Sequence, residues 1–302
     1  MDDKAQGGAA ADIAPATGNA MSGAGASPLA DIPVMDVVVG DYRIEAPDEV
    51  PAGWTTVRLR NEGQQAHFVV FYRLPDGKTI ADQQREVVPL FDQAMAALAA
   101  GEVDRAGAGA ILGGLPAWAA ESKYRGGPGL LSPGGTTMAT INLDEPGTYL
   151  MECYVKSPDG LFHTSMGMLR EIQVTADNNG AAEPEADFDI RLSNAGIDAP
   201  AVVAAGPHLV RVNFVEDPQA PLPYDVHLAR LAGETDASKL VHWMDWMNID
   251  GLRAPAPVEF LGGVENTPAG RNGYLSIDLE PGRYAWVSEI NAQQMLREFV
   301  VE

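Results

Sequence analysis

Residues 147–174 read GTYLMECYVKSPDGLFHTSMGMLREIQV. Both ends of this stretch are rich in β-branched and aromatic residues, whereas Pro and Gly interrupt its middle. The pattern predicts strands at 148–154 and 169–174 with a loop between them. Cys153, His163 and Met168 fall in this stretch. Three side chains able to bind a metal ion are therefore clustered around one loop between two strands.

Other short segments of the same character precede this stretch, each bounded by Gly, Pro or Asp: 36–44, 55–59, 67–73 and 136–143. Their spacing predicts an all-β domain, a β-sandwich or a barrel. Residues 82–125 differ, because apolar side chains recur there at helical spacing up to Gly101. Pro116 opens a further short helix through Trp118. We therefore expect a helical insertion in an otherwise β domain.

The second half of the chain repeats the first. Three blocks recur in the same order: LDEPGTY (143–149) as LEPGRY (279–284), MLREIQV (168–174) as MLREFVV (295–301), and VPAG with VRL (50–53, 57–59) as VAAG with VRV (203–206, 210–212). Matched blocks in one order predict an internal duplication, in which both copies share one β fold.

Composition divides the chain into four parts. Residues 1–34 are Ala/Gly-rich with few large apolar side chains, which predicts a flexible tether. Residues 35–175 form the first β domain, 176–186 a linker, and 187–302 the second, divergent copy. A tether of this kind often follows a cleaved export signal or a lipid anchor. We therefore expect an exported protein, periplasmic, extracellular or tethered to a membrane.

The chain is strongly acidic. Its 302 residues include 42 acidic and 20 basic side chains, a formal net charge of −22. Such a charge makes nucleic acid and anionic lipid surfaces poor candidates for partners. Residues 176–302 hold 20 of the acidic and 8 of the basic side chains. This excess of negative charge either serves solubility or forms an acidic face for a basic partner. No apolar run approaches the ~18 residues of a membrane helix.

Cys153 is the single cysteine, which excludes an internal disulfide and any multi-cysteine zinc or iron–sulfur site of this chain alone. His67 lies upstream, at the start of the predicted strand 67–73. One thiolate, two imidazoles and one thioether are the ligands of a blue-copper site. Taken singly, a cysteine or methionine is more often a buried core residue than a metal ligand. A single histidine is more often a surface or hydrogen-bonded residue than a metal ligand. Together and in this order, the four residues favour copper.

The same residues resemble the cupredoxin superfamily, the fold of plastocyanin and of copper nitrite reductase domains. In that family a strand with Gly-x-Tyr or Gly-x-Phe leads to the copper cysteine, a loop histidine follows, and Gly-Met precedes the last strand. Here the order is Gly147-Thr148-Tyr149, Cys153, His163 and Gly167-Met168, with the turn Asn61-Glu62-Gly63 before His67. The resemblance implies two tandem Greek-key β-sandwiches and one type 1 copper held by His67, Cys153, His163 and Met168.

Some features depart from the small members of that family. Nine residues separate Cys153 from His163, close to the long loop of nitrite reductase domains, and the helical insertion has no counterpart. Met166 is a competing thioether. Met168 is preferred because it keeps the Gly-Met spacing and recurs as Met295.

The second copy lacks the copper ligands. Cys153 aligns with Ser288, and no histidine follows Tyr284. His227 lies near the position that matches His67, but we do not expect it to hold copper alone. The second copy is interpreted as a scaffold or docking domain. His208 and His242 are expected to be surface or packing residues. The segment WMDWM at 243–247 is either a core cluster or an exposed partner patch, and the core interpretation is preferred.

The remaining motifs argue against the copper enzymes of this family. No His-x-His pair is present, and Glu152 stands where nitrite reductases place a histidine. The resemblance implies a carrier, not an enzyme, that transfers single electrons through one copper, with Leu161 and Phe162 as a docking rim. The expected partner is a redox protein such as a basic cytochrome, and the sequence is compatible with an oligomer. The alternative is a non-redox copper-handling or structural β-sandwich protein.

Overall fold

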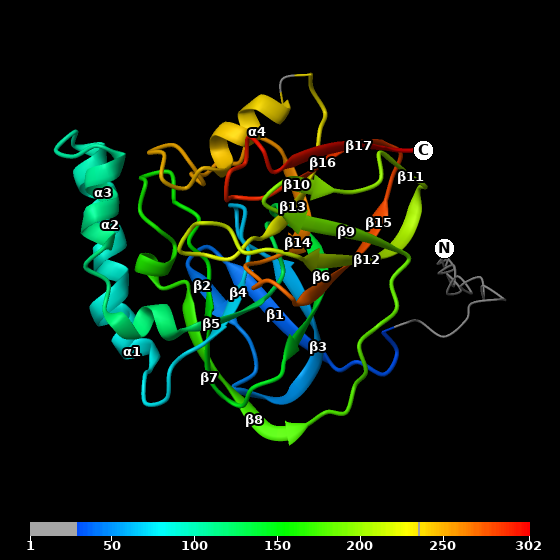
Figure 1. The fold of residues 1–302 in the computed structure, drawn as a ribbon, viewed down its shortest axis with the longest axis horizontal. Helices are drawn as coiled ribbons and strands as arrows, with labels where there is room; N and C mark the ends of the chain where they lie inside the picture. The colour runs from blue at the N-terminus through cyan, green and yellow to red at the C-terminus, as the bar shows by residue number, and fades with distance from the viewer. Residues whose placement is uncertain (1–28, 235) are drawn as a thin grey trace, which may run out of the picture.

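The computed structural model describes residues 29–234 and 236–302. Most of the predicted tether, residues 1–28, lies outside the described residues, and in the rest of it Ile32 is buried. Strands arranged in two sheets make up the larger part of the regular structure, and the helices of the first half gather along one side (Figure 1). The predicted all-β class with a helical insertion is confirmed.

The first half contributes two layers that share one long strand, β3 (Glu49–Asn61). In the first layer β3 pairs with β1 (Val34–Gly40) and β6 (Thr136–Leu143), and β2 (Arg43–Glu45) pairs with β1. The second layer contains, in order across the sheet, β8 (Leu169–Asn178), β7 (Gly147–Glu152), β4 (Val70–Arg73) and β5 (Lys123–Gly126). The first residues of β3 pair with β8 and so join the two layers.

The second half has the same two-layer form. One layer continues the large sheet with β10 (Gly196–Asp198), β9 (Phe188–Ser193), β12 (Gly206–Phe214) and β15 (Asn272–Leu279). The other is a five-stranded sheet in the order β11 (Val202–Val203), β17 (Leu296–Val301), β16 (Gly282–Val287), β13 (Val226–Arg230) and β14 (Glu259–Val264).

The two halves repeat the same local contacts. The N–H of Cys153 donates to the Met168 carbonyl at 3.2 Å, and the N–H of Ser288 donates to the Met295 carbonyl at 3.0 Å. A tyrosine hydroxyl also donates to a carbonyl four residues earlier in both copies: Tyr149 to Glu145 and Tyr284 to Glu280. Ser288 therefore occupies the position that Cys153 has in the first copy.

The halves are joined through a common sheet. β6 of the first half pairs with β15 of the second, with Thr140 opposite Tyr274. A second connection runs through residues 128–131, because Gly129 donates to the Gly263 carbonyl at 3.1 Å. The segment therefore lies between the two copies.

The helical insertion is made of α1 (Ile80–Asp82), the π-helical turn η1 (Gln83–Val87), α2 (Val88–Ala99), α3 (Arg105–Leu112) and the 3₁₀ turn η2 (Ala117–Glu121). Gly101 has a φ of 69°, a conformation that suits glycine just past a helix end. The helical range was predicted too long, since residues 123–126 form strand β5 against β4. In the second half, α4 (Asp236–Met244) was not predicted.

Two predicted strands differ from those found. The predicted strand 36–44 is divided into β1 and β2 by a turn in which Tyr42 has a φ of 68°. The predicted strand 67–73 is regular only from Val70, and His67 instead forms an isolated bridge with Leu131. That bridge proves relevant to the candidate site.

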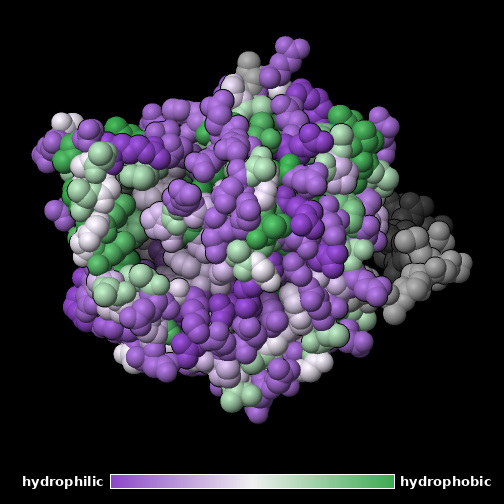
Figure 2. All heavy atoms as spheres, viewed as in Figure 1, coloured by the Kyte–Doolittle hydropathy of each residue, from purple (hydrophilic) through white to green (hydrophobic). Residues whose placement is uncertain are grey.

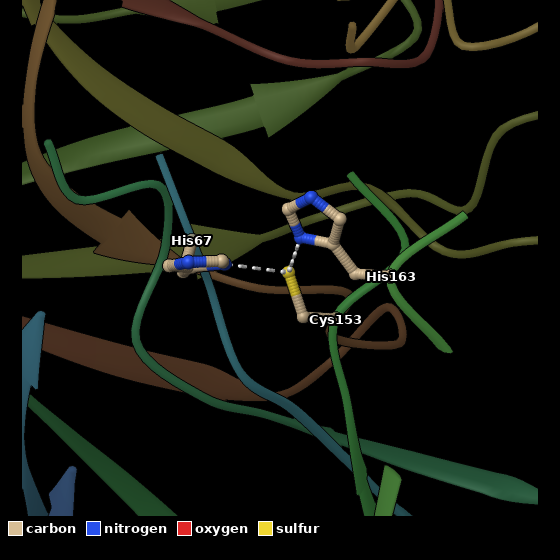
Figure 3. A group of neighbouring side chains, drawn as sticks. All are labelled: His67, Cys153 and His163. Carbon is tan, nitrogen blue, oxygen red and sulfur yellow. Dashed lines mark hydrogen bonds between the residues drawn. The ribbon is translucent and has the colours of Figure 1, made fainter. Parts of the chain in front are cut away.

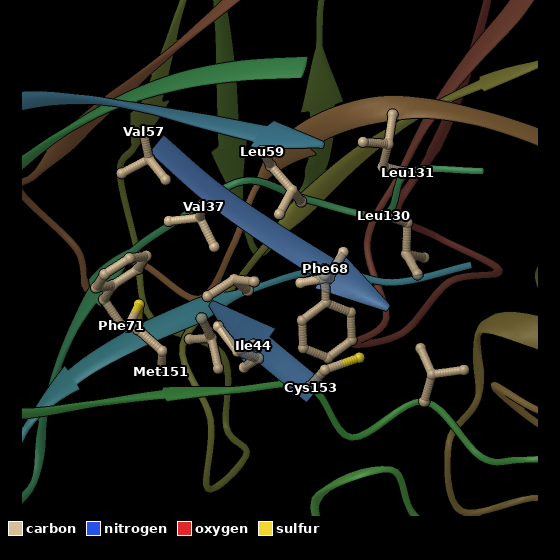
Figure 4. Close-up of a cluster of buried hydrophobic side chains, with 14 of the residues drawn as sticks. Val37, Ile44, Val57, Leu59, Phe68, Phe71, Leu130, Leu131, Met151 and Cys153 are labelled. Carbon is tan, nitrogen blue, oxygen red and sulfur yellow. The ribbon is translucent and has the colours of Figure 1, made fainter. Parts of the chain in front are cut away.

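Both layers of the first half pack on one apolar core. Val37, Leu59, Phe71, Met151 and Cys153 belong to it (Figure 4). The outer surface in view is mostly hydrophilic, with smaller hydrophobic areas, one of them along the side where Figure 1 places α2 and α3 (Figure 2). Within the described ranges, every helix is too short or too polar to cross a membrane.

Candidate metal centre

The structure brings His67, Cys153 and His163 together. The Nδ1 atoms of both histidines lie 3.7 Å from Cys153 Sγ, and both rings are turned toward the sulfur in Figure 3. All three side chains are fully buried, at 0% exposure. One sulfur and two nitrogens thus share a small dry volume in which a single metal ion can contact them all.

Three parts of the chain position these side chains. Cys153 directly follows β7 and belongs to the apolar core. His163 is held on the returning loop because its N–H donates to the Val155 carbonyl at 2.8 Å. His67 exchanges two backbone hydrogen bonds with Leu131, at 3.1 and 2.8 Å. Backbone hydrogen bonds therefore hold both histidines in place.

Hydrogen bonds to the outer ring nitrogens fix both histidine tautomers. Nε2 of His67 lies 3.0 Å from Asp41 Oδ1, and Nε2 of His163 lies 3.1 Å from Gln65 Oε1. The amide nitrogen of Gln65 donates to the Tyr42 hydroxyl at 3.0 Å, which directs Oε1 at the ring. Both outer partners are acceptors, so the ring protons lie on Nε2 and the lone pairs of Nδ1 face the sulfur.

Asp41 is itself held in place. Its Oδ1 accepts from the N–H groups of Gln64 and Gln65 at 3.0 and 3.3 Å. Burial raises the pKa of Asp41, but the hydrogen bonds from His67 and Gln64 outweigh it and lower the pKa. A Cβ on Gly63 would overlap Asp41 Oδ1 and lie 2.9 Å from His67 Nε2. Neither Asp41 nor Gln65 was predicted from the sequence.

Burial controls the protonation of the three inner groups. It raises the pKa of the Cys153 thiol to about 12, although the backbone N–H groups of Phe68 and Val155 oppose this. Burial also lowers the pKa of His67, and burial together with the neighbouring His67 lowers the pKa of His163 to about 3. At neutral pH the metal-free site therefore holds a thiol and two neutral imidazoles, and a metal ion has to displace the thiol proton.

The donor set fits one small metal ion. Metal–sulfur and metal–nitrogen bonds of about 2.3 and 2.0 Å that meet at roughly 120° span about 3.7 Å between sulfur and nitrogen. The two sulfur-to-nitrogen distances in the structure are both 3.7 Å. One thiolate with two imidazoles is the trigonal set that copper takes in blue-copper sites.

Met168 lies beside this set. It is fully buried, its carbonyl accepts from Cys153 N–H at 3.2 Å, and its N–H donates to the His163 carbonyl at 2.9 Å. Met166, on the 3₁₀ turn η3 (Thr164–Met166), is only half-buried. Gly167, with a φ of 112°, turns the chain between the two methionines. Met168 is therefore the more deeply buried of the two methionines, and its assignment as the axial thioether stays a prediction from the sequence.

The loop between Cys153 and His163 is anchored on the second half of the chain. Lys156 is fully buried, and its Nζ donates to the carbonyls of Trp246 and Asn248, both at 2.7 Å. Its backbone N–H donates to the Leu252 carbonyl at 2.7 Å. Part of the second copy thus fixes the loop that carries two of the candidate ligands.

The expected docking rim differs in part. Leu161 is 50% exposed, but Phe162 is buried. The Phe162 ring lies 6.2 Å from that of Phe91 and 6.5 Å from that of Trp246. The helical insertion and the second copy therefore cover this side of the loop.

Residues expected to be packing or surface residues are found as such. His242 is exposed, and His208 is half-buried with its Nε2 2.7 Å from the Ala204 carbonyl. Trp243 and Met244 are core residues. His227, by contrast, is fully buried among carboxylates, an environment not foreseen from the sequence.

No protein-family model and no curated protein matches the chain. Similar solved structures include reduced auracyanin from Roseiflexus castenholzii, at 24% identity over 50% of this chain and 99% of that chain (TM-score 0.26). Auracyanin A, a blue copper protein from Chloroflexus aurantiacus, shares 20% identity over 47% of this chain and 98% of that chain (TM-score 0.28). A copper-containing nitrite reductase from Thermus scotoductus shares 13% identity over 89% of this chain and 61% of that chain (TM-score 0.23).

Proposed function

We propose that the chain is a type 1 copper protein that carries single electrons. His67, Cys153, His163 and Met168 would hold the copper. The convergence of two Nδ1 atoms on one buried sulfur, each at 3.7 Å, is the observation that supports this most directly. Copper held in this way supplies one-electron redox chemistry, alternating between Cu(I) and Cu(II).

The surrounding residues have definable roles in such a carrier. Asp41 and Gln65 orient the two imidazoles, so the ligands need little rearrangement between oxidation states. Tyr42 packs edge-on against His163, with ring centroids 5.3 Å apart, and both Tyr42 and Gln65 are partly exposed. We propose this side of His163, in place of the buried Phe162, as the place where electrons enter and leave.

The proposed role is a carrier and not an enzyme. Glu152, at the position of the additional histidine in nitrite reductases, accepts a hydrogen bond from the Tyr72 hydroxyl at 2.5 Å. This carboxylate is therefore already engaged within the first half. The export, the membrane tether and the basic redox partner expected from the sequence remain part of the proposal.

A redox titration tests the function. The full chain is loaded with one equivalent of Cu(II), freed of excess metal, and cycled with a mild reductant and oxidant while its absorption is followed. A carrier shows one bound copper and full, repeated recovery of the Cu(II) signal. Tight Cu(I) binding without a stable Cu(II) form would favour the copper-handling alternative, and no bound copper would leave a structural β-sandwich.

A further inference from the structure

A second cluster of ionisable side chains lies at the equivalent end of the second copy. Asp225 precedes β13, His227 lies on β13, Glu265 follows β14, and Glu289 lies just beyond β16. The pairing registers of β13 with β14 and with β16, continued past the strand ends, place Asp225 opposite both glutamates. Like charges directly opposite one another destabilise a sheet, so the cluster calls for a compensating positive charge.

The cluster is buried and incompletely hydrogen-bonded. Asp225, His227 and Glu265 are 0% exposed and Glu289 is 4% exposed. His227 Nε2, Glu289 Oε1 and both carboxylate oxygens of Glu265 have no hydrogen-bond partner. In the described part of the chain, His227 is the only cationic candidate within ion-pair distance of these carboxylates. Buried groups of this kind are normally satisfied by a hydrogen-bond partner, a water molecule or an ion.

We propose that Asp225, His227 and Glu289 bind one divalent metal ion of the Zn²⁺ or Mn²⁺ type. One ligand atom from each of the three lies within 4.8 Å of the others. His227 Nε2 is 3.3 Å from Asp225 Oδ1 and 3.7 Å from Glu289 Oε1. Two carboxylates with one imidazole suit such ions, and Ser288 stands where the copper site has its sulfur.

Glu265 acts in this site as a positioning residue for His227. The Leu130 N–H donates to His227 Nδ1 at 3.0 Å, which leaves the proton of a neutral ring on Nε2. A metal ion on Nε2 requires the other neutral tautomer, with the ring proton on Nδ1, so the Leu130 N–H gives up this acceptor. Glu265 Oε1 lies 3.7 Å from Nδ1 and has no hydrogen-bond partner, so it accepts this N–H once the ring or the carboxylate shifts closer. Metal-bound histidines are commonly held by such a carboxylate.

The electrostatics agree with this geometry. Three carboxyl groups surround one imidazole, since atoms of Asp225, Glu265 and Glu289 all lie within 3.7 Å of the His227 ring nitrogens. The cluster thus attracts positive charge, for which a proton and a metal ion compete. Tyr154, the neighbour of Cys153, has its hydroxyl 3.2 Å from Glu289 Oε2. The two metal sites are therefore adjacent, yet they share no ligand.

Zinc binding to the full chain tests the proposal. The chain is first given one equivalent of copper, then titrated with ZnCl₂ by calorimetry, and its melting temperature is followed with added Zn²⁺. We expect one zinc per chain and a rise in melting temperature. The double variant Asp225→Asn/Glu289→Gln should bind zinc at least about 100-fold more weakly, and Glu265→Ala about 10- to 100-fold more weakly. The exposed Asp278→Asn serves as the matched control and should bind as the parent does.

The outcomes separate this site from the copper site. The absence of a zinc site, or unchanged zinc affinity in a folded double variant, would overturn the inference whatever copper does. Circular dichroism establishes that the variants fold, and removing buried charges should not unfold the metal-free chain. Copper uptake is measured in the same samples, so a failed copper site with an intact zinc site would overturn only the proposed function.

Discussion

Each of the two candidate histidine ligands, His67 and His163, lies between the Cys153 sulfur and a hydrogen-bond acceptor. Their Nδ1 atoms face Cys153 Sγ, while Asp41 and Gln65 take the outer nitrogens. The sequence could predict His67, Cys153 and His163 because the local motif spacing carries that signal. Asp41 and Gln65 could not be predicted, since a turn between β1 and β2 brings Asp41 to His67 from 26 residues away.

Removal of the Asp41 carboxylate should weaken copper binding. In Asp41→Ala, the His67 ring loses its outer acceptor, and we expect copper affinity to fall about 10- to 100-fold. Competition with a copper chelator measures the change. Asp36→Ala, which removes an exposed carboxylate paired with Arg58, is the control and should leave the affinity unchanged. Equal affinities for the two variants would contradict the role of Asp41.

The two methionines can be separated by matched substitutions. Met168→Leu keeps the buried volume but removes the proposed axial thioether, so we expect a changed reduction potential and a changed Cu(II) spectrum. Met166→Leu, at the half-buried neighbour, should leave both nearly unchanged. Potentiometric titration of the three proteins gives the answer. A shift confined to Met166→Leu would instead assign the axial position to Met166.

At the scale of elements, the loop from Cys153 to His163 depends on the second copy. Lys156 reaches the carbonyls of Trp246 and Asn248, just beyond α4. The sequence predicted the strands on either side of this loop but placed no element over it. Neither α4 nor the loop contacts follow from local periodicity, because they depend on how two distant segments pack.

Lys156→Met should loosen this loop. The change leaves two part-buried carbonyls without this donor, at a cost of about 1 kcal/mol each in the free energy of unfolding. Urea denaturation measures the loss of stability. The variant should also release bound copper faster than the parent. Lys123→Met, at a lysine whose side chain is 51% exposed, should cost far less. If both variants are equally stable, the anchoring role of Lys156 is wrong.

At the scale of the whole molecule, the two copies are built as one unit. The internal duplication was predictable from the repeated blocks, and Ser288 stands where the first copy has Cys153. The pairing of β6 with β15 was not predictable, because strands at the edges of two similar domains carry no mark of their partner. The carboxylate cluster was missed for the same reason: only the registers of β13, β14 and β16 bring its members together.

Stability of the metal-free chain should fall in acid. The folded-state pKa values of His67 and His163 are lowered, that of His163 to about 3, whereas the unfolded value is about 6.5. The unfolded chain therefore takes up these protons first, and the stabilisation present above pH 6.5 is lost as the pH falls toward 3. Urea midpoints between pH 7 and 4 should drop less steeply for His163→Gln than for the parent. Identical slopes would contradict the lowered pKa of His163.

The absorption spectrum of the copper-loaded chain tests the central claim most directly. With Cu(II) bound by a thiolate, the parent should show an intense sulfur-to-copper charge-transfer band, and Cys153→Ser should lose it. Metal analysis on the same samples establishes how much copper each protein holds. A parent that binds copper without the band, or a Cys153→Ser variant that keeps its full intensity, would contradict the assignment of Cys153 as the copper ligand.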